Sequence, residues 1–275
     1  MKVTFRCPAL AMPKVLIVTD QESGLLGEAL KQAILLQSDI GVTTIDNFDH
    51  SALINERIGS EDTILCPLTL KIPSSLKFPQ QAVYRACADI TGLRQRVEEL
   101  HVPTGEGKFW LPIVLTSKGV LYAEAITLAD QGTASNAFRY LQPFHLSDRY
   151  RQPLYALGQR LLKLISATPA AYLMQFGFAG ETVFFDRLFP FPAAPAIASL
   201  NVQSPNLFAC HWRCLSDTPI LDLTIAQSTE HQVFQPLLSN LQSGDNRAWN
   251  DKSSQQSVVA FKNVKGTIEL SDFKN

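Results

Sequence analysis

The sequence predicts an α/β protein in which a parallel-sheet unit precedes an α+β unit with a mixed sheet. Over about the first 100 residues, short apolar segments alternate with helical patterns, which is typical of parallel sheets. After residue 105, strand-like pairs joined by short turns surround one strongly amphipathic helix. The 275 residues, 46% of them hydrophobic, suffice for one large domain or two modest ones with a sizeable core.

The first unit begins with a strand, because the apolar run 15–18 precedes a turn and a helical pattern from Leu25 to Ile34. Further strands are expected at residues 42–45 and 63–66. A second helical pattern covers residues 81–100 and stops before Pro103, since proline disfavours helix at the residue that precedes it.

The second unit is expected to contain two hairpins and a helix. Its strands are predicted at residues 110–116 and 120–127, and at residues 172–178 and 182–186. The helix is predicted over residues 153–165, because small and apolar side chains recur there at helical spacing and mark one buried face. After Ile225 the composition becomes polar, so residues 239–257 are predicted to be flexible. Residues 258–261 and 266–270 are compatible with a last hairpin.

These patterns divide the chain into four parts. We predict a poorly ordered extension over residues 1–13, a parallel-sheet domain over 14–104, a second domain over 105–225 and a partly flexible C-terminal segment over 226–275.

Charge and cysteine content exclude several classes of partner. With 24 Lys and Arg against 25 Asp and Glu, the net charge of −1 offers no field for nucleic acid or an anionic membrane. The longest apolar run is far shorter than the roughly 20 residues that a membrane-spanning helix needs. The 5 cysteines are odd in number, and no secretory signal precedes them. We therefore expect reduced thiols in a cytoplasmic protein.

Two local motifs have both a structural and a functional interpretation. Cys210, His211 and Cys214 combine residue types that bind zinc, but the second half of a four-ligand set is missing, so no metal site is predicted. Gly24 and Gly27 follow a strand and open a helix, where free backbone N–H groups can hold an anion. Neither a G-x-S-x-G motif, a phosphate loop nor a G-x-G-x-x-G fingerprint is present.

Five motifs occur in a fixed order along the chain. They lie at residues 24–30, at 89–104, at 175–176, at 186–192 and at 208–213. They resemble, in turn, the motifs G-Q-L-G-R-M-L, a helix from D-R to L-G-I-P-T, V-E-M-F, N-E-I-A-P-R-P and F-E-Q-H-L-R of one family. That family is the ATP-grasp enzyme carboxyaminoimidazole ribonucleotide synthetase of purine biosynthesis, the ATPase subunit of phosphoribosylaminoimidazole carboxylase. The resemblance covers about residues 14–223 and implies a Rossmann-like pre-ATP-grasp domain followed by an ATP-grasp domain.

The departures from this family affect the groups that hold its ligands. In the family, a lid subdomain lies between the P-T of the second motif and the next strand, and it supplies the cations that hold ATP. Only residues 105–109 fill that interval here, so the resemblance implies a lid-less second domain. Gln175, Asp186 and Arg187 stand where the family has carboxylates and an asparagine for magnesium. An arginine at about 4 Å repels a divalent ion by roughly 8 kcal/mol at an effective dielectric near 20.

Our leading hypothesis is a degenerate, non-catalytic ATP-grasp-like protein that acts as a binding, regulatory or scaffold partner. Phe191 and residues 193–197 stand where the family binds phosphate and ribose, and this stretch is apolar here. We expect neither ATP nor magnesium as a cofactor, and the resemblance implies a homodimer or another protein partner.

Two alternatives remain open at this point. The first is a divergent ATP-dependent carboxylate–amine ligase that uses ATP and magnesium, with Asp186, Arg187, His211 and Arg213 around a small anionic ligand. A pocket on which Arg187, His211 and Arg213 converge would favour it. The second is a structural subunit of a complex, which predicts an exposed apolar patch formed by the side chains of Phe189, Phe191 and Ile197.

Overall fold

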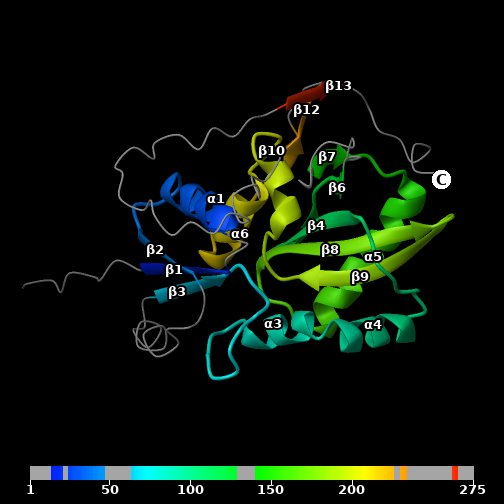
Figure 1. Ribbon diagram of the computed structural model, residues 1–275, viewed down its shortest axis with the longest axis horizontal. Helices are drawn as coiled ribbons and strands as arrows, with labels where there is room; N and C mark the ends of the chain where they lie inside the picture. The colour runs from blue at the N-terminus through cyan, green and yellow to red at the C-terminus, as the bar shows by residue number, and fades with distance from the viewer. Residues whose placement is uncertain are drawn as a thin grey trace, which may run out of the picture.

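The computed structural model describes residues 14–20, 24–46, 63–128 and 140–225, and the backbone of residues 230–233 and 262–265 (Figure 1). It contains a parallel sheet and a larger antiparallel sheet, with helices on both faces of the larger one. The α/β class with two different sheets is therefore confirmed, but the strands of the second sheet pair antiparallel where a mixed sheet was predicted.

The parallel sheet has the strand order β2-β1-β3. Its strands are β1 (Lys14–Thr19), β2 (Gly41–Asp46) and β3 (Thr63–Pro67). The central strand β1 is apolar at consecutive positions because both of its faces are covered. Val15 and Ile17 pack against α1 (Gly24–Leu35), whereas Leu16 and Val18 pack against Leu76 on the other face. The first predicted strands and helix are thus confirmed.

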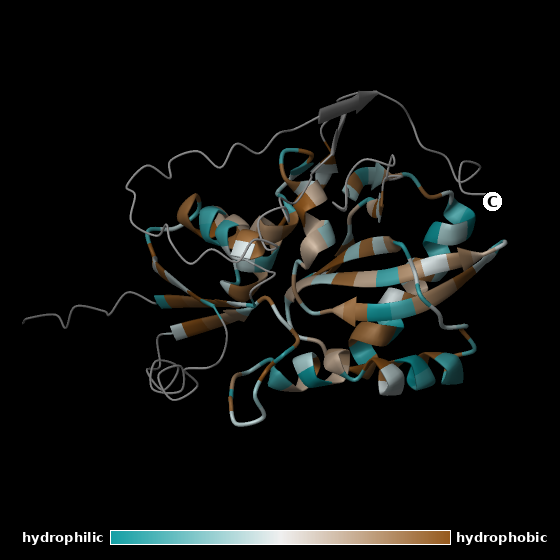
Figure 2. Ribbon diagram, in the orientation of Figure 1, coloured by the Kyte–Doolittle hydropathy of each residue, from teal (hydrophilic) through white to brown (hydrophobic). Residues whose placement is uncertain are grey.

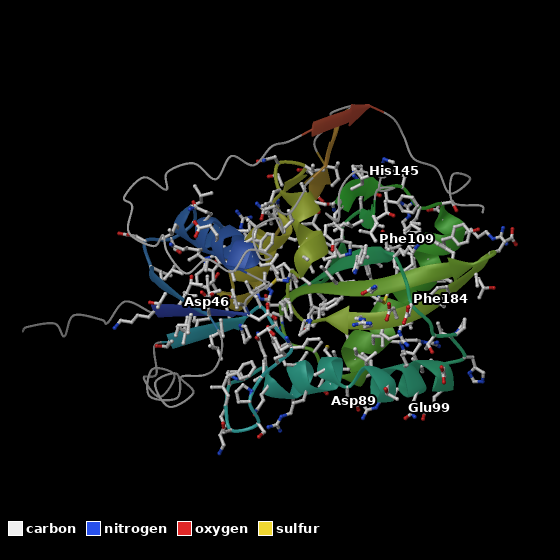
Figure 3. The ribbon with its side chains drawn as sticks, viewed as in Figure 1. Asp46, Asp89, Glu99, Phe109, His145 and Phe184 are labelled. Atoms are coloured by element: carbon white, nitrogen blue, oxygen red, sulfur yellow. The ribbon has the colours of Figure 1, made fainter. Side chains whose placement is uncertain are left out.

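The helical pattern over residues 81–100 forms two helices rather than one. Helix α3 (Gln81–Ala88) ends where α4 (Ile90–Glu99) begins, and Asp89 lies between them (Figure 3). The Asp89 side chain accepts a hydrogen bond from the Gly92 backbone N–H at 2.9 Å, which caps α4. The prediction of a single helical stretch was wrong. Hydrophobic periodicity continues across Asp89 and so does not indicate that this residue caps a new helix.

The larger sheet has the order β7-β6-β4-β8-β9, and β5 pairs with β4. Its strands are β4 (Phe109–Thr116), β5 (Gly119–Tyr122), β6 (Ala125–Leu128), β7 (Tyr140–Phe144), β8 (Ala170–Ala179) and β9 (Thr182–Phe189). All of these strands pair antiparallel, and a parallel bridge between Thr104 and Phe185 extends the sheet beyond β9. The predicted strand 120–127 is two strands, β5 and β6, which pair with different parts of β4.

Different helices cover the two faces of this sheet (Figure 1). One face packs against α3, α4 and α5 (Asp148–Leu164), which begins before the predicted residue 153 and contains Pro153. The other face packs against α6 (Leu207–Leu215) and the short helix η1 (Ala194–Ser199). Helix α6 also contacts α1, so one hydrophobic core cluster joins both sheets. Strands of both sheets carry long brown, apolar stretches, whereas α3 and α4 carry teal, hydrophilic ones (Figure 2).

Two short ladders complete the described backbone. Strand β10 (Gln203–Ser204) pairs with β11 (Thr224–Ile225), and β12 (Glu230–Val233) pairs with β13 (Lys262–Lys265). The predicted extension 1–13, the polar stretch 239–257 and the proposed last hairpin at 258–261 and 266–270 lie outside the described residues. Among the helices described, none has the length and apolar content that a membrane crossing would need.

Four cysteines of the described chain are free and buried, namely Cys66, Cys87, Cys210 and Cys214. Burial raises the pKa of each of these thiols to about 12. Because the thiolate is the reactive form, we predict that all four are inert towards Ellman's reagent in the native protein and react once the chain is unfolded. A Cys7→Ser variant isolates these four thiols, and absorbance after reagent addition counts them. A thiol that reacts equally fast in both states would contradict the burial.

Candidate functional site

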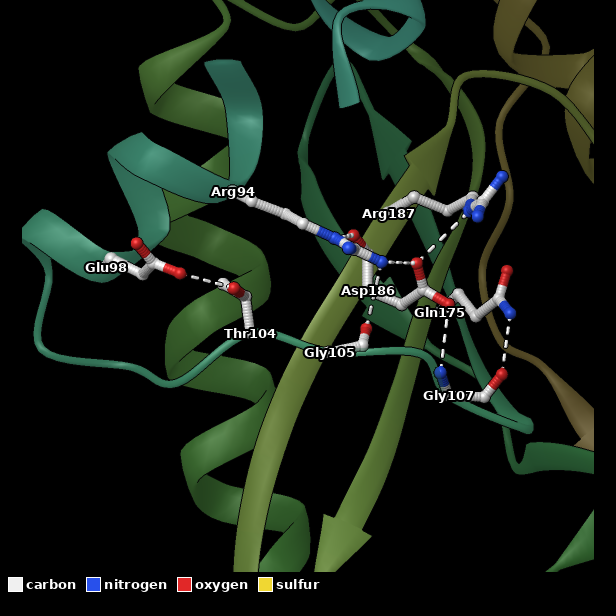
Figure 4. Close-up of polar contacts among 8 residues, drawn as sticks. All are labelled: Arg94, Glu98, Thr104, Gly105, Gly107, Gln175, Asp186 and Arg187. Atoms are coloured by element: carbon white, nitrogen blue, oxygen red, sulfur yellow. Dashed lines mark hydrogen bonds and ion pairs between the residues drawn. The ribbon is translucent and has the colours of Figure 1, made fainter. Parts of the chain in front are cut away.

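The segment that joins α4 to β4, residues 103–108, crosses two strands of the larger sheet (Figure 4). We refer to it as the connecting segment. Phe185 N–H donates to the Pro103 carbonyl and Gly105 N–H donates to the Phe185 carbonyl, both at 2.9 Å, so the segment first runs beside β9. Gly107 then contacts β9 and β8 in succession: its N–H donates to Asp186 Oδ2 at 2.9 Å, and its carbonyl accepts from Gln175 Nε2 at 2.7 Å.

A β-bulge aims Asp186 at the connecting segment. Gln175 pairs with Arg187 and the next residue of β8, Phe176, pairs with Phe185, so Asp186 is an extra residue in β9. Its side chain is only 2% exposed. A charged group this deeply buried needs partners, because burying an unpaired carboxylate is far more costly than leaving it in water.

Two arginines supply the opposite charge. Arg94 of α4 places its Nη2 at 2.6 Å from Asp186 Oδ1, and Nε of Arg187 lies 3.2 Å from the same oxygen. Arg94 also donates to the backbone carbonyl of Asp186 at 3.0 Å and to that of Gly105 at 3.1 Å. The guanidinium of Arg94 therefore links α4, β9 and the connecting segment in one network (Figure 4).

This network does not fit a divalent metal. The carboxylate of Asp186 accepts hydrogen bonds on both oxygens, from Arg94, Arg187 and Gly107. Gln175 is neutral and is engaged by the Gly107 carbonyl. Two cations and one anion meet here, whereas a magnesium site needs several hard anionic oxygens. Across the described part of the chain, no group of three or more His, Cys, Asp or Glu side chains could hold a metal ion.

Gly107 is required by the close approach of the connecting segment to β8. A Cβ atom at residue 107 would lie 2.0 Å from the Phe176 carbonyl oxygen and 2.9 Å from the backbone nitrogen of Gly177. Both atoms belong to a central strand, so neither can move away cheaply. Next to this crossing, Thr104 Oγ1 donates to Glu98 Oε1 at 2.5 Å and holds the start of the segment against α4.

The predicted anion-binding residues of α6 do not converge with Arg187. His211 is 1% exposed, and its Nδ1 accepts from the Ala171 N–H at 3.3 Å. Arg213 instead donates from Nε to Gln37 Oε1 at 2.7 Å, beyond the end of α1. Among the contacts of the described residues, none joins any two of the three side chains. The described contacts thus do not show the convergence that would favour the ligase alternative, since α6 turns His211 into the sheet and Arg213 towards α1.

The predicted apolar patch lies in the core. Phe191 is 4% exposed and Ile197 is 5% exposed, and both belong to the cluster that joins the two sheets. Phe191 stacks on Tyr84 with ring centroids 5.9 Å apart, and the half-buried Phe189 packs edge-on against Phe191. The prediction that these side chains form an exposed patch is wrong, because the chain after β9 fills the space between the sheets.

The two glycines of the predicted anion-binding turn have different surroundings. A Cβ atom at Gly24 would meet nothing within 4 Å, so this position is open. At Gly27 it would lie 2.8 Å from Cγ2 of Thr19, so Gly27 allows α1 to pack closely on β1. The turn itself, residues 21–23, lies outside the described residues, and an anion site there stays a prediction.

Sequence reasoning missed Arg94 and Gly107, the two residues that complete the network. Arg94 lies within the motif at 89–104, but its partner Asp186 is 92 residues away. The signal that could have found Gly107 is the pair of glycines inside the shortened interval, since close backbone approach selects glycine.

The sequence matches no protein-family model, and no curated protein matches it either. Solved structures share its fold. Carboxyaminoimidazole ribonucleotide synthase from Aspergillus clavatus, complexed with ATP, has a TM-score of 0.64 at 10% identity over 82% of this chain and 81% of that one. N5-carboxyaminoimidazole synthetase from Staphylococcus aureus with ADP gives 0.64 at 8% over 82% of each chain. Glycinamide-RNase-transformylase T from Mycobacterium tuberculosis gives 0.60 at 16% over 81% and 83%. The family resemblance is thus confirmed at the level of the fold.

We predict that Gly107→Ala destabilises the protein by about 1 to 3 kcal/mol, because the added methyl overlaps the backbone of β8. The matched control is Gly24→Ala, at an open position in the first turn of α1, which we expect to be neutral or slightly stabilising. Denaturant unfolding followed by circular dichroism measures both variants. Equal stability of the two variants would contradict the crossing.

We predict that His211 makes the protein sensitive to acid. Burial lowers the pKa of His211 from its usual 6.5 to about 4, so the unfolded chain takes up this proton first as pH falls. The contribution is fully present above about pH 6.5 and is lost progressively towards pH 4, by about 3 kcal/mol in total.

His211→Asn tests this because asparagine keeps a hydrogen-bond acceptor but does not titrate. Its free energy of unfolding should fall less steeply with acid than that of the wild type. The wild type, unfolded in parallel over the same pH range, is the reference for this slope. An unchanged slope in His211→Asn would refute the assignment.

Proposed function

We propose that this chain has the ATP-grasp fold without the ligase reaction, and that it acts as a binding or regulatory partner of other proteins. The observation that carries the proposal is the state of Asp186, a buried carboxylate whose oxygens are engaged by Arg94, Arg187 and Gly107. In the family that the sequence resembles, this position belongs to the magnesium ligands. Here the same carboxylate fixes the connecting segment that replaces the lid.

The short interval between α4 and β4 supports the same proposal. Residues 105–108 lie between α4 and β4, where the family carries the subdomain that holds ATP. Glu106 and Lys108 are exposed, but the two glycines of the segment lie against β9 and β8. The remaining segment is too short to cover a nucleotide. We further propose a homodimer or a complex with another protein in the cytoplasm, the compartment that suits four reduced, buried cysteines.

A second candidate function is a divergent ATP-dependent carboxylate–amine ligase. It is favoured by the solved structures of similar fold, which are named as synthases or synthetases of carboxyaminoimidazole ribonucleotide and include complexes with ATP and ADP. Under this candidate, Arg187 would hold a small anionic ligand, because its side chain is 33% exposed beside Gln175. ATP and magnesium would then have to bind without the lid.

Calorimetric titration with ATP and magnesium distinguishes the two candidates. We expect no magnesium-dependent binding and no release of ADP when aminoimidazole ribonucleotide and bicarbonate are added, whereas an active synthetase run in parallel shows both. Micromolar, magnesium-dependent binding coupled to turnover would establish the ligase instead. Light scattering on the same sample tests the proposed homodimer, and a monomeric mass at working concentration would exclude it.

A further inference from the structure

Three oxygen atoms from two segments surround the guanidinium of Arg94 (Figure 4). They are the carboxylate Oδ1 of Asp186 at 2.6 Å, the backbone carbonyl of Asp186 at 3.0 Å and the backbone carbonyl of Gly105 at 3.1 Å. None of these oxygens belongs to the helix that carries Arg94. The guanidinium thus enters from α4 into an oxygen cluster built by β9 and the connecting segment.

This oxygen cluster is held together without Arg94. Gly107 N–H binds Asp186 Oδ2, and Gly105 N–H binds the Phe185 carbonyl, each at 2.9 Å. The N–H of Phe185 in turn binds the Pro103 carbonyl. Because these backbone contacts fix the bulge and the connecting segment to each other, shortening the side chain of residue 94 would leave the oxygen atoms in place with a cavity between them.

We infer that β9 and the connecting segment form a cation site that the chain fills with its own guanidinium, so that Arg94 is a built-in counter-ion and a positioning residue. The site favours a planar monovalent cation over a divalent metal for two reasons. Its three oxygen atoms accept hydrogen bonds from the fork of a guanidinium, and Arg187, at 3.2 Å from Asp186 Oδ1, places a second positive charge beside the site that would repel a divalent ion. A free guanidinium ion is therefore the ligand class that an emptied site would take.

The inference also concerns the native protein. With the site filled from within, neither a chelator nor added calcium or magnesium should change its melting temperature. The test of the cation site does not depend on whether the chain is a ligase, because every melting temperature is measured without nucleotide. Failure of the cation site and failure of the proposed function are therefore distinguishable.

Chemical rescue tests the inference. Arg94→Ala should lower the melting temperature by about 6 °C or more, because it leaves the buried Asp186 without its main partner. Methylguanidinium chloride should recover much of this loss with a saturable concentration dependence, whereas equal concentrations of sodium chloride or calcium chloride should not. Arg94→Gln, which keeps a donor without the charge, serves the same test if the alanine variant does not fold.

Arg85→Ala is the matched control. Arg85 lies on α3 and donates to the Ser74 carbonyl at 2.9 Å, without a carboxylate partner in the described contacts. Methylguanidinium should give this variant and the wild type no gain. The double variant Arg94→Gln with Asp186→Asn should lose the rescue. The inference is overturned if methylguanidinium rescues neither Arg94 variant. It is also overturned if calcium rescues these variants better than methylguanidinium does, or if methylguanidinium rescues Arg85→Ala to the same extent.

Discussion

The ion pair between Arg94 and Asp186 is the interaction that allows this site to bury a carboxylate. It joins residues 92 positions apart and is the point where α4, the connecting segment and the bulge of β9 meet. Exposed ion pairs contribute little to stability, whereas removing one partner of a buried pair leaves a charge without solvent. Asp186 belongs to the second class because its side chain is almost fully buried. Backbone contacts hold the carboxylate in place, and Arg94 supplies the opposite charge that its burial requires.

A second constraint is the hydrophobic core shared by the two sheets. Helix α6 contacts both α1 and β8, so residues that look functional in the sequence are used to connect layers. His211 contributes an acceptor to the backbone of β8, and Phe191 stacks on Tyr84. The low share of charged residues in the sequence fits this arrangement, since the region between the sheets consists of apolar side chains. A polar ligand site at the same positions would need donors that this core does not provide.

Local patterns predicted most of the elements but little of the site. Strands β1 and β3 follow from apolar runs bounded by turns, because continuous apolar segments mark buried parallel strands. The break at Asp89 was missed, since capping depends on one hydrogen bond rather than on periodicity. The order of family-like motifs predicted the fold, which solved structures at 8 to 16% identity confirm. Arg94 and Gly107 escaped because their roles arise from contacts between strands and segments that no local pattern encodes.

The same contacts explain how a short connection can cross the larger sheet in this fold. A short connection across a sheet exposes backbone groups that need partners, and it brings a backbone close to the strands beneath. Gly107 allows the close approach because it has no Cβ atom. Asp186 accepts a hydrogen bond from the Gly107 N–H, and Gln175 donates one to the Gly107 carbonyl. Arg94 then balances the carboxylate that this solution buries. A residue type suited to a metal ligand thus serves a structural purpose here, and the charge that a metal would supply comes from the chain itself.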